Sequence, residues 1–129
     1  MRKAEARWQT IFNQFLRKQA GMHKMFGFYE LKQTEENSIP FADLKVHQAE
    51  GLQAAENSGL VWKLSDADPR TKPFDCISVP PNPSYVVIKF PDGFYIFRTF
   101  VFLAEARDNK RKSLTVERAN EIAERVIHI

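Results

Sequence analysis

Glu30 and Lys32 are the two residues of this chain whose types and spacing best suit chemistry. They stand two apart in an apolar, aromatic segment, residues 28–34, that predicts a β-strand, and alternate side chains of a strand lie on one face. A carboxylate can bind a hard divalent cation. A neighbouring ammonium can orient a water molecule or stabilise charge that develops on a phosphate. The pair therefore suits metal-assisted cleavage of a phosphodiester, although Glu-x-Lys pairs also occur on solvated strand faces.

Gln48 occupies a position where the sequence pattern predicts an apolar residue. Leu44, Gln48 and Leu52 fall on one stripe of a helix predicted for residues 41–57. A buried amide needs partners for its donors and its acceptor. Gln48 therefore either bonds backbone where the helix meets the sheet or holds a water molecule or ligand at an active site. His47, beside Gln48, is expected to face outward. It is not expected to bind a metal, because no second histidine stands at metal-ligand spacing.

Asp75 is an acid within a segment, residues 74–79, whose other side chains predict a strand. Aspartate is disfavoured in strands, so it marks either an edge or turn position or a functional site. If Asp75 met Glu30 across the sheet, the two carboxylates would repel each other unless a divalent cation lay between them. Such an oxygen-only ligand set suits magnesium or manganese rather than zinc.

These residues resemble the RecU and Hjc branch of Holliday-junction resolvases, within the PD-(D/E)XK nuclease superfamily. The most specific part of the resemblance is Glu30-x-Lys32 with His47-Gln48. It extends over residues 26–58 and 84–129, where the similar segments are Gln33-Thr34, Ser38-Ile39-Pro40-Phe41, Leu52, Tyr85–Phe90, Phe94–Ile96 and Lys112–Leu114. The resemblance implies a restriction-endonuclease-like core in which Glu30 binds the metal and Lys32 acts on the attacking water.

The chain departs from this family pattern in the position of one acid. The family's motif aspartate lies on the strand before Glu-x-Lys, and residues 23–29 contain no aspartate. We therefore expect the aspartate-bearing strand to have moved along the chain, so that Asp75 docks beside the Glu30 strand in a rearranged strand order. Many relatives also carry a glutamate on the first helix beside the metal. Glu5 is the matching candidate, or else a solvated acid at a helix start.

The resemblance implies a magnesium- or manganese-dependent endodeoxyribonuclease that cleaves branched DNA. Its catalytic residues would be Glu30, Lys32, Asp75, Gln48 and Glu5, of which Asp75, Glu30 and Glu5 would bind the metal. A homodimer is implied as well, since resolvases cut two opposed strands. Two alternatives stay open: a less selective nuclease of the same superfamily, and a non-catalytic DNA-binding or assembly protein on a decayed nuclease fold.

Basic residues towards both ends of the chain are candidates for contacts to DNA phosphates. Each is otherwise an ordinary charge on a solvated surface. Together with Thr34, the candidates are Arg2, Lys3, Arg7, Lys24, Lys110, Arg111 and Lys112. The formal net charge of +3 is compatible with DNA binding without requiring it. Trp62 and the aromatic residues of segment 94–102 are expected in a core or an interface rather than stacked on bases.

Length and composition predict a single domain over residues 1–129, because 43% hydrophobic residues suffice for one core. A single cysteine, Cys76, excludes an internal disulfide and a cysteine-rich zinc site. Its apolar neighbours predict a buried thiol. The sequence shows no signal-like start and no apolar segment of membrane-spanning length. We expect a soluble, intracellular protein of the cytoplasm, with no membrane partner and no small-molecule cofactor.

The elements that would position these residues follow from periodicity and turn signals. Helices are predicted for residues 2–19, 41–57 and 115–126, with Thr115 as the cap of the last, and strands for residues 25–33, 60–64, 74–79, 84–90 and 94–103. Pro91-Asp92-Gly93 predicts a hairpin turn, and residues 104–112 predict a loop. This order predicts an α/β (α+β) fold with a mixed central sheet flanked by helices.

Overall fold

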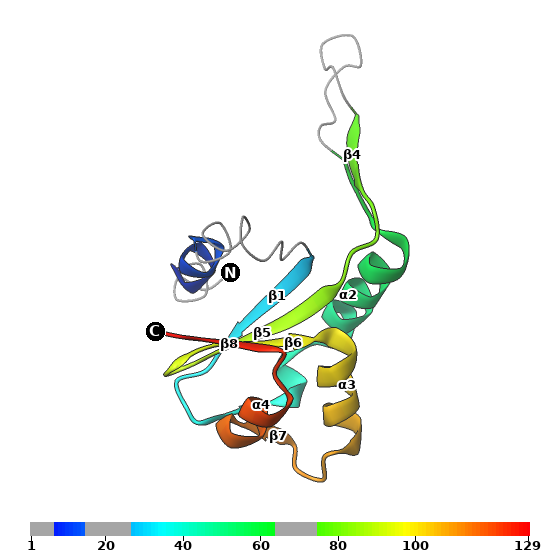
Figure 1. Cartoon of the computed structure of the whole chain (residues 1–129). Coiled ribbons are helices and arrows are strands. Elements are labelled where there is room, and N and C mark those ends of the chain that lie inside the picture. The colour runs from blue at the N-terminus through cyan, green and yellow to red at the C-terminus, as the bar shows by residue number, and fades with distance from the viewer. Residues whose placement is uncertain (1–6, 15–26, 64–74) are drawn as a thin grey trace.

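The computed structural model of this chain describes residues 7–14, 27–63 and 75–129. A four-stranded mixed sheet lies at its centre, in the order β1-β5-β6-β8. These strands span Phe28–Gln33, Ser84–Phe90, Gly93–Arg98 and Arg125–His128. β1 runs parallel to β5, and β5, β6 and β8 are antiparallel neighbours. Helices cover both faces (Figure 1), so the predicted α+β class with a mixed central sheet is confirmed.

Three helices cover one face of the sheet: α2 (Val46–Ser58), α3 (Thr99–Asp108) and α4 (Val116–Ile122). Their apolar stripes pack on β5 and β6 because alternate residues of those strands point to this face. The largest fully buried side chains of the resulting cluster are Phe90, Tyr95, Phe97 and Phe102. Among the helices in the described segments, none is both long and apolar enough to cross a membrane.

The opposite face of the sheet is covered by the helical residues 7–14. The ring of Phe12 lies 5.2 Å from Phe94 and 5.7 Å from Tyr29, measured between centroids. Trp8 meets Phe94 edge to face at 6.2 Å. The apolar stripe predicted for the first helix is therefore confirmed where it is described. The rest of the predicted helix, residues 2–6 and 15–19, lies outside the described residues.

Lys89 is the single charged residue of β5 and lies on this same face, 5% exposed. Its ammonium donates a hydrogen bond to the Phe90 carbonyl oxygen and sits 4.4 Å from the centroid of the Trp8 ring. Burial lowers the pKa of Lys89 below its ordinary value. The sequence alone does not single out this residue, because one lysine in an apolar strand gives no motif.

A small antiparallel sheet extends the core beside α4. It pairs β2 (Ser38–Pro40) with β7 (Ser113–Thr115), and a 3-10 helix follows β2 at Phe41–Asp43. Ile39 and Leu114 lie opposite each other in this pairing and are both buried. The Thr115 hydroxyl accepts a hydrogen bond from the Arg118 backbone N–H, which confirms the predicted cap of α4.

The remaining strands form a hairpin that projects from the end of α2, away from the central sheet (Figure 1). β3 (Leu60–Lys63) and β4 (Cys76–Val79) pair with each other in a two-stranded sheet. We call this hairpin the β3–β4 arm. Nearly every residue of it is exposed, Val61 by 68%, Trp62 by 65% and Ile77 by 53%. The predicted burial of Cys76 is wrong, because its strand leaves the core and exposes the thiol.

Several predicted boundaries differ from the structure, and the largest differences are three. The strand predicted to end at residue 103 ends at Arg98, because residues 99–108 form α3 and turn Phe102 onto Phe97. The last helix ends at Ile122, and Val126 instead pairs with Tyr95 as part of β8. The helix predicted from residue 41 begins at Val46, after the 3-10 turn. In a short apolar run the spacing of apolar residues fits both the helical and the strand repeat, so periodicity alone does not decide between helix and strand.

Glu56 fastens the C-terminal part of α2 to the central sheet. Its Oε1 accepts hydrogen bonds from the Ser84 backbone N–H, at 2.9 Å, and from the Arg98 guanidinium, at 2.8 Å. The Ser84 bond, together with the Arg98 partner, holds the pKa of this carboxyl below its ordinary value of 4.5. A depressed carboxyl pKa stabilises the fold above the ordinary pKa, and this stabilisation is lost as the pH falls through the folded-state value.

Glu56→Gln is therefore expected to lower the free energy of unfolding at pH 7 by about 1.5 kcal/mol. The difference from the wild type should shrink as the pH falls below the ordinary carboxyl pKa, since both proteins are then uncharged at this position. Urea denaturation at a series of pH values measures it. Glu50→Gln, on an exposed part of the same helix, is the control. A difference that stays constant down to low pH would contradict this role.

Candidate functional site

Glu30 and Lys32 lie side by side on β1. Their register partners on β5 are Val86 and Ile88, so both point to the face covered by α2. The Lys32 ammonium is 3.5 Å from Glu30 Oε1. The Lys32 side chain is 15% exposed and the Glu30 side chain 31%, so the pair is held by the fold yet open to solvent. The predicted placement on one strand face is confirmed.

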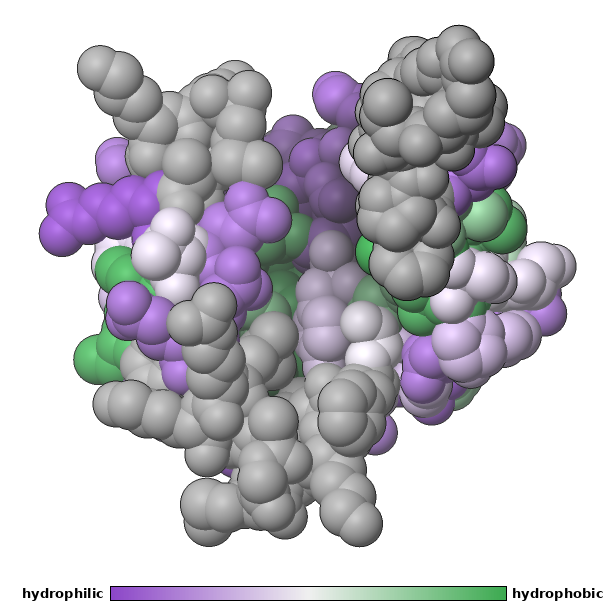
Figure 2. All heavy atoms as spheres, turned by 90° about the horizontal axis from the view of Figure 1, so that it is seen from above, coloured by the Kyte–Doolittle hydropathy of each residue, from purple (hydrophilic) through white to green (hydrophobic). Residues whose placement is uncertain are grey.

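An open pocket of about 530 Å³ lies between β1, α2 and the start of the β3–β4 arm. Glu30 lines it from the strand and Gln48 from the helix, with apolar walls from Phe28, Leu52 and Leu60. Figure 2 looks down on this end of the molecule, where the surface is hollowed and hydrophobic and hydrophilic areas adjoin. The pocket therefore offers a carboxylate and an amide beside an apolar wall.

Gln48 joins the pocket to the start of α2. Its side-chain Oε1 accepts a hydrogen bond from the Lys45 backbone N–H at 2.9 Å, and the backbone N–H of Gln48 donates to the Lys45 carbonyl oxygen at 3.0 Å. The amide oxygen thus caps the helix, which supports the interpretation that Gln48 bonds backbone. Because Gln48 also lines the pocket, the same residue fixes the helix start relative to Glu30. His47 is exposed, as expected.

Gly51 also lines the pocket and was missed by sequence analysis. It lies inside α2, where glycine is less favourable than alanine by about 0.5–1 kcal/mol. A Cβ built at Gly51 would meet no atom within 4 Å, so no contact within the chain requires a glycine here. A glycine in the middle of a predicted helix was the available signal. It leaves α2 open to close approach along the pocket.

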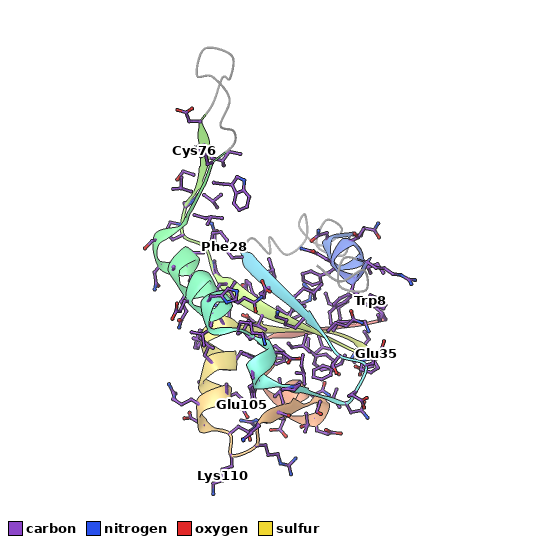
Figure 3. The ribbon with its side chains drawn as sticks, turned by 180° about the vertical axis from the view of Figure 1, so that it is seen from behind. Trp8, Phe28, Glu35, Cys76, Glu105 and Lys110 are labelled. Carbon is purple, nitrogen blue, oxygen red and sulfur yellow. The ribbon has the colours of Figure 1, made fainter. Side chains whose placement is uncertain are left out.

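Asp75 does not reach this pocket within one chain. Its neighbour Cys76 pairs with Lys63, at the end of the β3–β4 arm remote from α2. Among the described strands, β4 pairs with β3 and β1 pairs with β5. Figure 3 shows the arm carrying Cys76 away from Phe28 at the start of β1. The predicted docking of the Asp75 strand beside the Glu30 strand is therefore wrong.

The physical reason is the short path between the two strands of the arm. Residues 60–63 and 76–79 are close in sequence, and closing a short loop costs less conformational entropy than a long-range pairing. Each strand also offers the other a matching β-branched and aromatic surface. Asp75 precedes β4 rather than lying within it, which agrees with the alternative interpretation of this aspartate as an edge or turn residue.

Carboxylates from one chain supply few metal ligands at the pocket. No group of three or more histidine, cysteine, aspartate or glutamate residues in the described segments is arranged to hold a metal ion. Glu30 is the acid that lines the pocket. Glu5, the other predicted ligand, lies outside the described residues. A magnesium ion can be held by one or two protein carboxylates together with substrate phosphates, so Glu30 with a bound phosphodiester fits that donor set.

The predicted DNA-contacting residues divide into three groups. Arg2, Lys3 and Lys24 lie outside the described residues. Lys110, Arg111 and Lys112 are exposed on the loop between α3 and β7, and Figure 3 places Lys110 at the opposite end of the molecule from the arm. Arg7 is exposed beside the Trp8 ring. The loop of Lys110, Arg111 and Lys112 therefore does not share one rim with the described pocket in a single chain.

Thr34 stabilises the loop that follows β1. Its hydroxyl donates to the Ser38 carbonyl at 3.0 Å and accepts from the Glu36 N–H at 3.1 Å. Its backbone N–H donates to the Lys89 carbonyl at 3.0 Å. These bonds give Thr34 a structural role in this loop. Its predicted contact with DNA phosphate stays a prediction.

No protein-family model matches this chain. No curated protein is significantly similar to it either. The chemistry of the pocket is therefore inferred from the geometry of Glu30, Lys32 and Gln48.

The basic loop gives a testable prediction about DNA affinity. Replacing Lys110, Arg111 and Lys112 by glutamine should weaken DNA binding and flatten its salt dependence, by about 0.9 in the slope of log K against log salt for each lost phosphate contact. Fluorescence anisotropy in EDTA measures this without cleavage. Arg118→Gln is the control, because Arg118 pairs with Glu105 and Glu121. An unchanged slope in the triple variant would remove this loop from the DNA-binding surface.

Proposed function

We propose that this chain is a metal-dependent endodeoxyribonuclease that uses magnesium or manganese and cleaves branched DNA. The observation that carries the proposal is the Glu30–Lys32 pair, whose charged groups lie 3.5 Å apart and are partly exposed, with Glu30 lining an open pocket. The strand that bears the pair leads through α2 into the parallel strand β5. The sequence resemblance to Holliday-junction resolvases supports the choice of substrate.

Glu30 would hold the metal ion together with oxygens of the scissile phosphate. When bound, the ion supplies Lewis-acid polarisation of the phosphate and a water molecule of lowered pKa. Lys32 would orient the attacking water and stabilise negative charge that builds up on the phosphate. Gln48 fixes the start of α2 through its bond to Lys45 and keeps the far wall of the pocket in register with Glu30.

Paired cleavage of a four-way junction requires two such sites, so the proposal includes a homodimer. It includes neither a small-molecule cofactor nor association with a membrane. The proposed location is the cytoplasm, where DNA and divalent cations are both at hand.

A cleavage assay tests the proposal. Labelled four-way junctions and linear duplexes with the same arms are incubated with the wild-type protein in Mg²⁺, in Mn²⁺ and in EDTA. We expect cleavage of the junction in either metal and none in EDTA. Equal rates on both substrates would remove the preference for branched DNA and leave a less selective nuclease.

One observation favours a second candidate, a non-catalytic DNA-binding protein on a decayed nuclease fold. Within one chain, Asp75 lies on an arm that points away from Glu30, so the described residues bring one acid to the pocket. Junction binding without cleavage in any divalent metal would favour this candidate over the nuclease.

A further inference from the structure

The β3–β4 arm exposes an unusual amount of apolar surface. Val61, Trp62 and Ile77 are each more than half exposed, and Lys63 is the one charged residue within its two strands. A two-stranded hairpin alone is at best marginally stable in water. The arm therefore needs a surface to pack on. The described part of the chain leaves both of its faces open to solvent.

The pocket beside Glu30 has the complementary character. Its walls are largely apolar: among the described residues that line it, Phe28, Leu52 and Leu60 lie beside one acid, Glu30. β5 is the one described strand that pairs with β1, and a strand edge can accept a further strand. Gly51 lets the backbone of another segment approach α2, since space beyond its Cα is empty. The pocket is thus shaped to receive an extended apolar segment.

The arm cannot fill the pocket of its own chain. Leu60, the first residue of the arm, already lines that pocket, and from there the arm points outward (Figure 1). Donor and acceptor surfaces therefore belong to the same chain but cannot meet within it. Two chains related by a two-fold axis satisfy both at once, because each arm then covers the other chain's pocket.

We propose that a second copy of this chain lays its β3–β4 arm over the pocket and brings its Asp75 to Glu30 of the first. This inference rests on the proposed nuclease function for the role of the two acids, but the exchange of arms stands on the apolar surfaces alone. Asp75 lies next to Cys76, at the outer end of the arm, so the reach that separates it from Glu30 within one chain serves to deliver it to another. Each site would then hold two acids from two chains.

Mixed dimers test which chain supplies the aspartate. Glu30→Gln and Asp75→Asn homodimers should both be inactive. A heterodimer of the two variants, purified through two different tags, keeps one pocket with Glu30 from one chain and Asp75 from the other. We expect it to regain one working site, and so about half of the wild-type rate of nicking.

The outcomes of this experiment separate the two proposals. An inactive heterodimer would overturn the exchange, because both acids would then act within one chain. A fully active Asp75→Asn homodimer would also overturn it, while inactivity of Glu30→Gln alone would leave the nuclease in place. A wild-type protein that cleaves no junction would contradict the proposed nuclease function itself.

Cross-linking tests the exchange without any catalysis. Glu30→Cys is combined with the native Cys76, and a short bis-maleimide should join two chains into a covalent dimer on a denaturing gel. The wild type and the Glu30→Cys/Cys76→Ser variant, each with one kind of cysteine, are the controls. A product cross-linked within one chain, or the absence of a Glu30→Cys-dependent dimer, would overturn the exchange.

Trp62→Ser tests the apolar contact. Light scattering should show that the dimer weakens, because a large exposed aromatic side chain contributes strongly to an interface core. Phe100→Ser is the matched control, since Phe100 is also an exposed aromatic residue, at 58%, but belongs to α3 and not to the arm. A dimer unchanged by Trp62→Ser, or a wild type that is monomeric at all concentrations, would contradict the proposed interface.

Discussion

Glu30→Gln is expected to lower the rate of metal-dependent DNA cleavage by about 10²–10³-fold or more, the range seen when one group that acts on developing charge is removed. Glutamine keeps the shape of the side chain but loses the negative charge that would hold the cation. Stability should change little, because a partly exposed ion pair at 3.5 Å is worth about 0–1 kcal/mol. Single-turnover cleavage of a four-way junction measures the rate, and thermal denaturation checks the fold.

Binding separates this role from a merely structural one. Glu30→Gln should bind the junction in EDTA as tightly as the wild type, or more tightly, since an acid near the phosphate has been removed. Glu35→Gln is the control, because Glu35 is an exposed acid in the loop just after β1. Full cleavage activity in Glu30→Gln would exclude Glu30 as a metal ligand.

Phe97→Ala is expected to destabilise the protein by about 3–5 kcal/mol. Phe97 is a fully buried residue of β6 in the core cluster between the sheet and the helices, with its ring 6.0 Å from that of Phe102. Alanine would leave a cavity that the surrounding strands and helices cannot fill without moving. Since a domain of this size has a total stability of about 5–15 kcal/mol, the variant should lose a large share of it. Urea denaturation gives the difference directly.

The matched control for the core is Phe100→Ala, three residues further along the chain. Phe100 is 58% exposed and contacts the Arg98 guanidinium at 5.2 Å from its ring centroid. Losing that contact should cost less than about 1 kcal/mol. Similar losses of stability in the two variants would mean that the buried Phe97 ring stabilises the fold no more than the exposed Phe100 ring does.

Much of the fold could be predicted from periodicity. The apolar run 84–90 forms the strand β5, buried on both faces as expected for a central strand, and Thr115 caps α4 as predicted. The return strand was predicted too long because Phe102 and Leu103 continue an aromatic, β-branched run. In the structure they stand three and four residues after Thr99 on α3 and pack on the core. Tertiary contact, rather than local preference, decides that segment.

The candidate site divides in the same way. The common face of Glu30 and Lys32 followed from strand alternation, which is local. The position of Asp75 depended on which strands pair, and strand pairing is set by loop length and by contacts far apart in sequence. The amide of Gln48 had two interpretations because a single residue type serves both as a cap and as a pocket wall. In the structure the Gln48 side-chain oxygen accepts a hydrogen bond from the Lys45 backbone N–H.

The two ends of the β3–β4 arm meet where it joins the rest of the molecule. Leu60 pairs with Val79, and Gly59, with φ of +78°, packs so closely on the Val79 carbonyl that a Cβ would collide with it. The arm therefore leaves and re-enters the fold at one point between α2 and β5. A segment joined in this way can lengthen, shorten or be replaced during evolution without changing the geometry of the crossover from β1 through α2 to β5. The reach of the arm can thus be tuned to a partner independently of the sheet that carries Glu30.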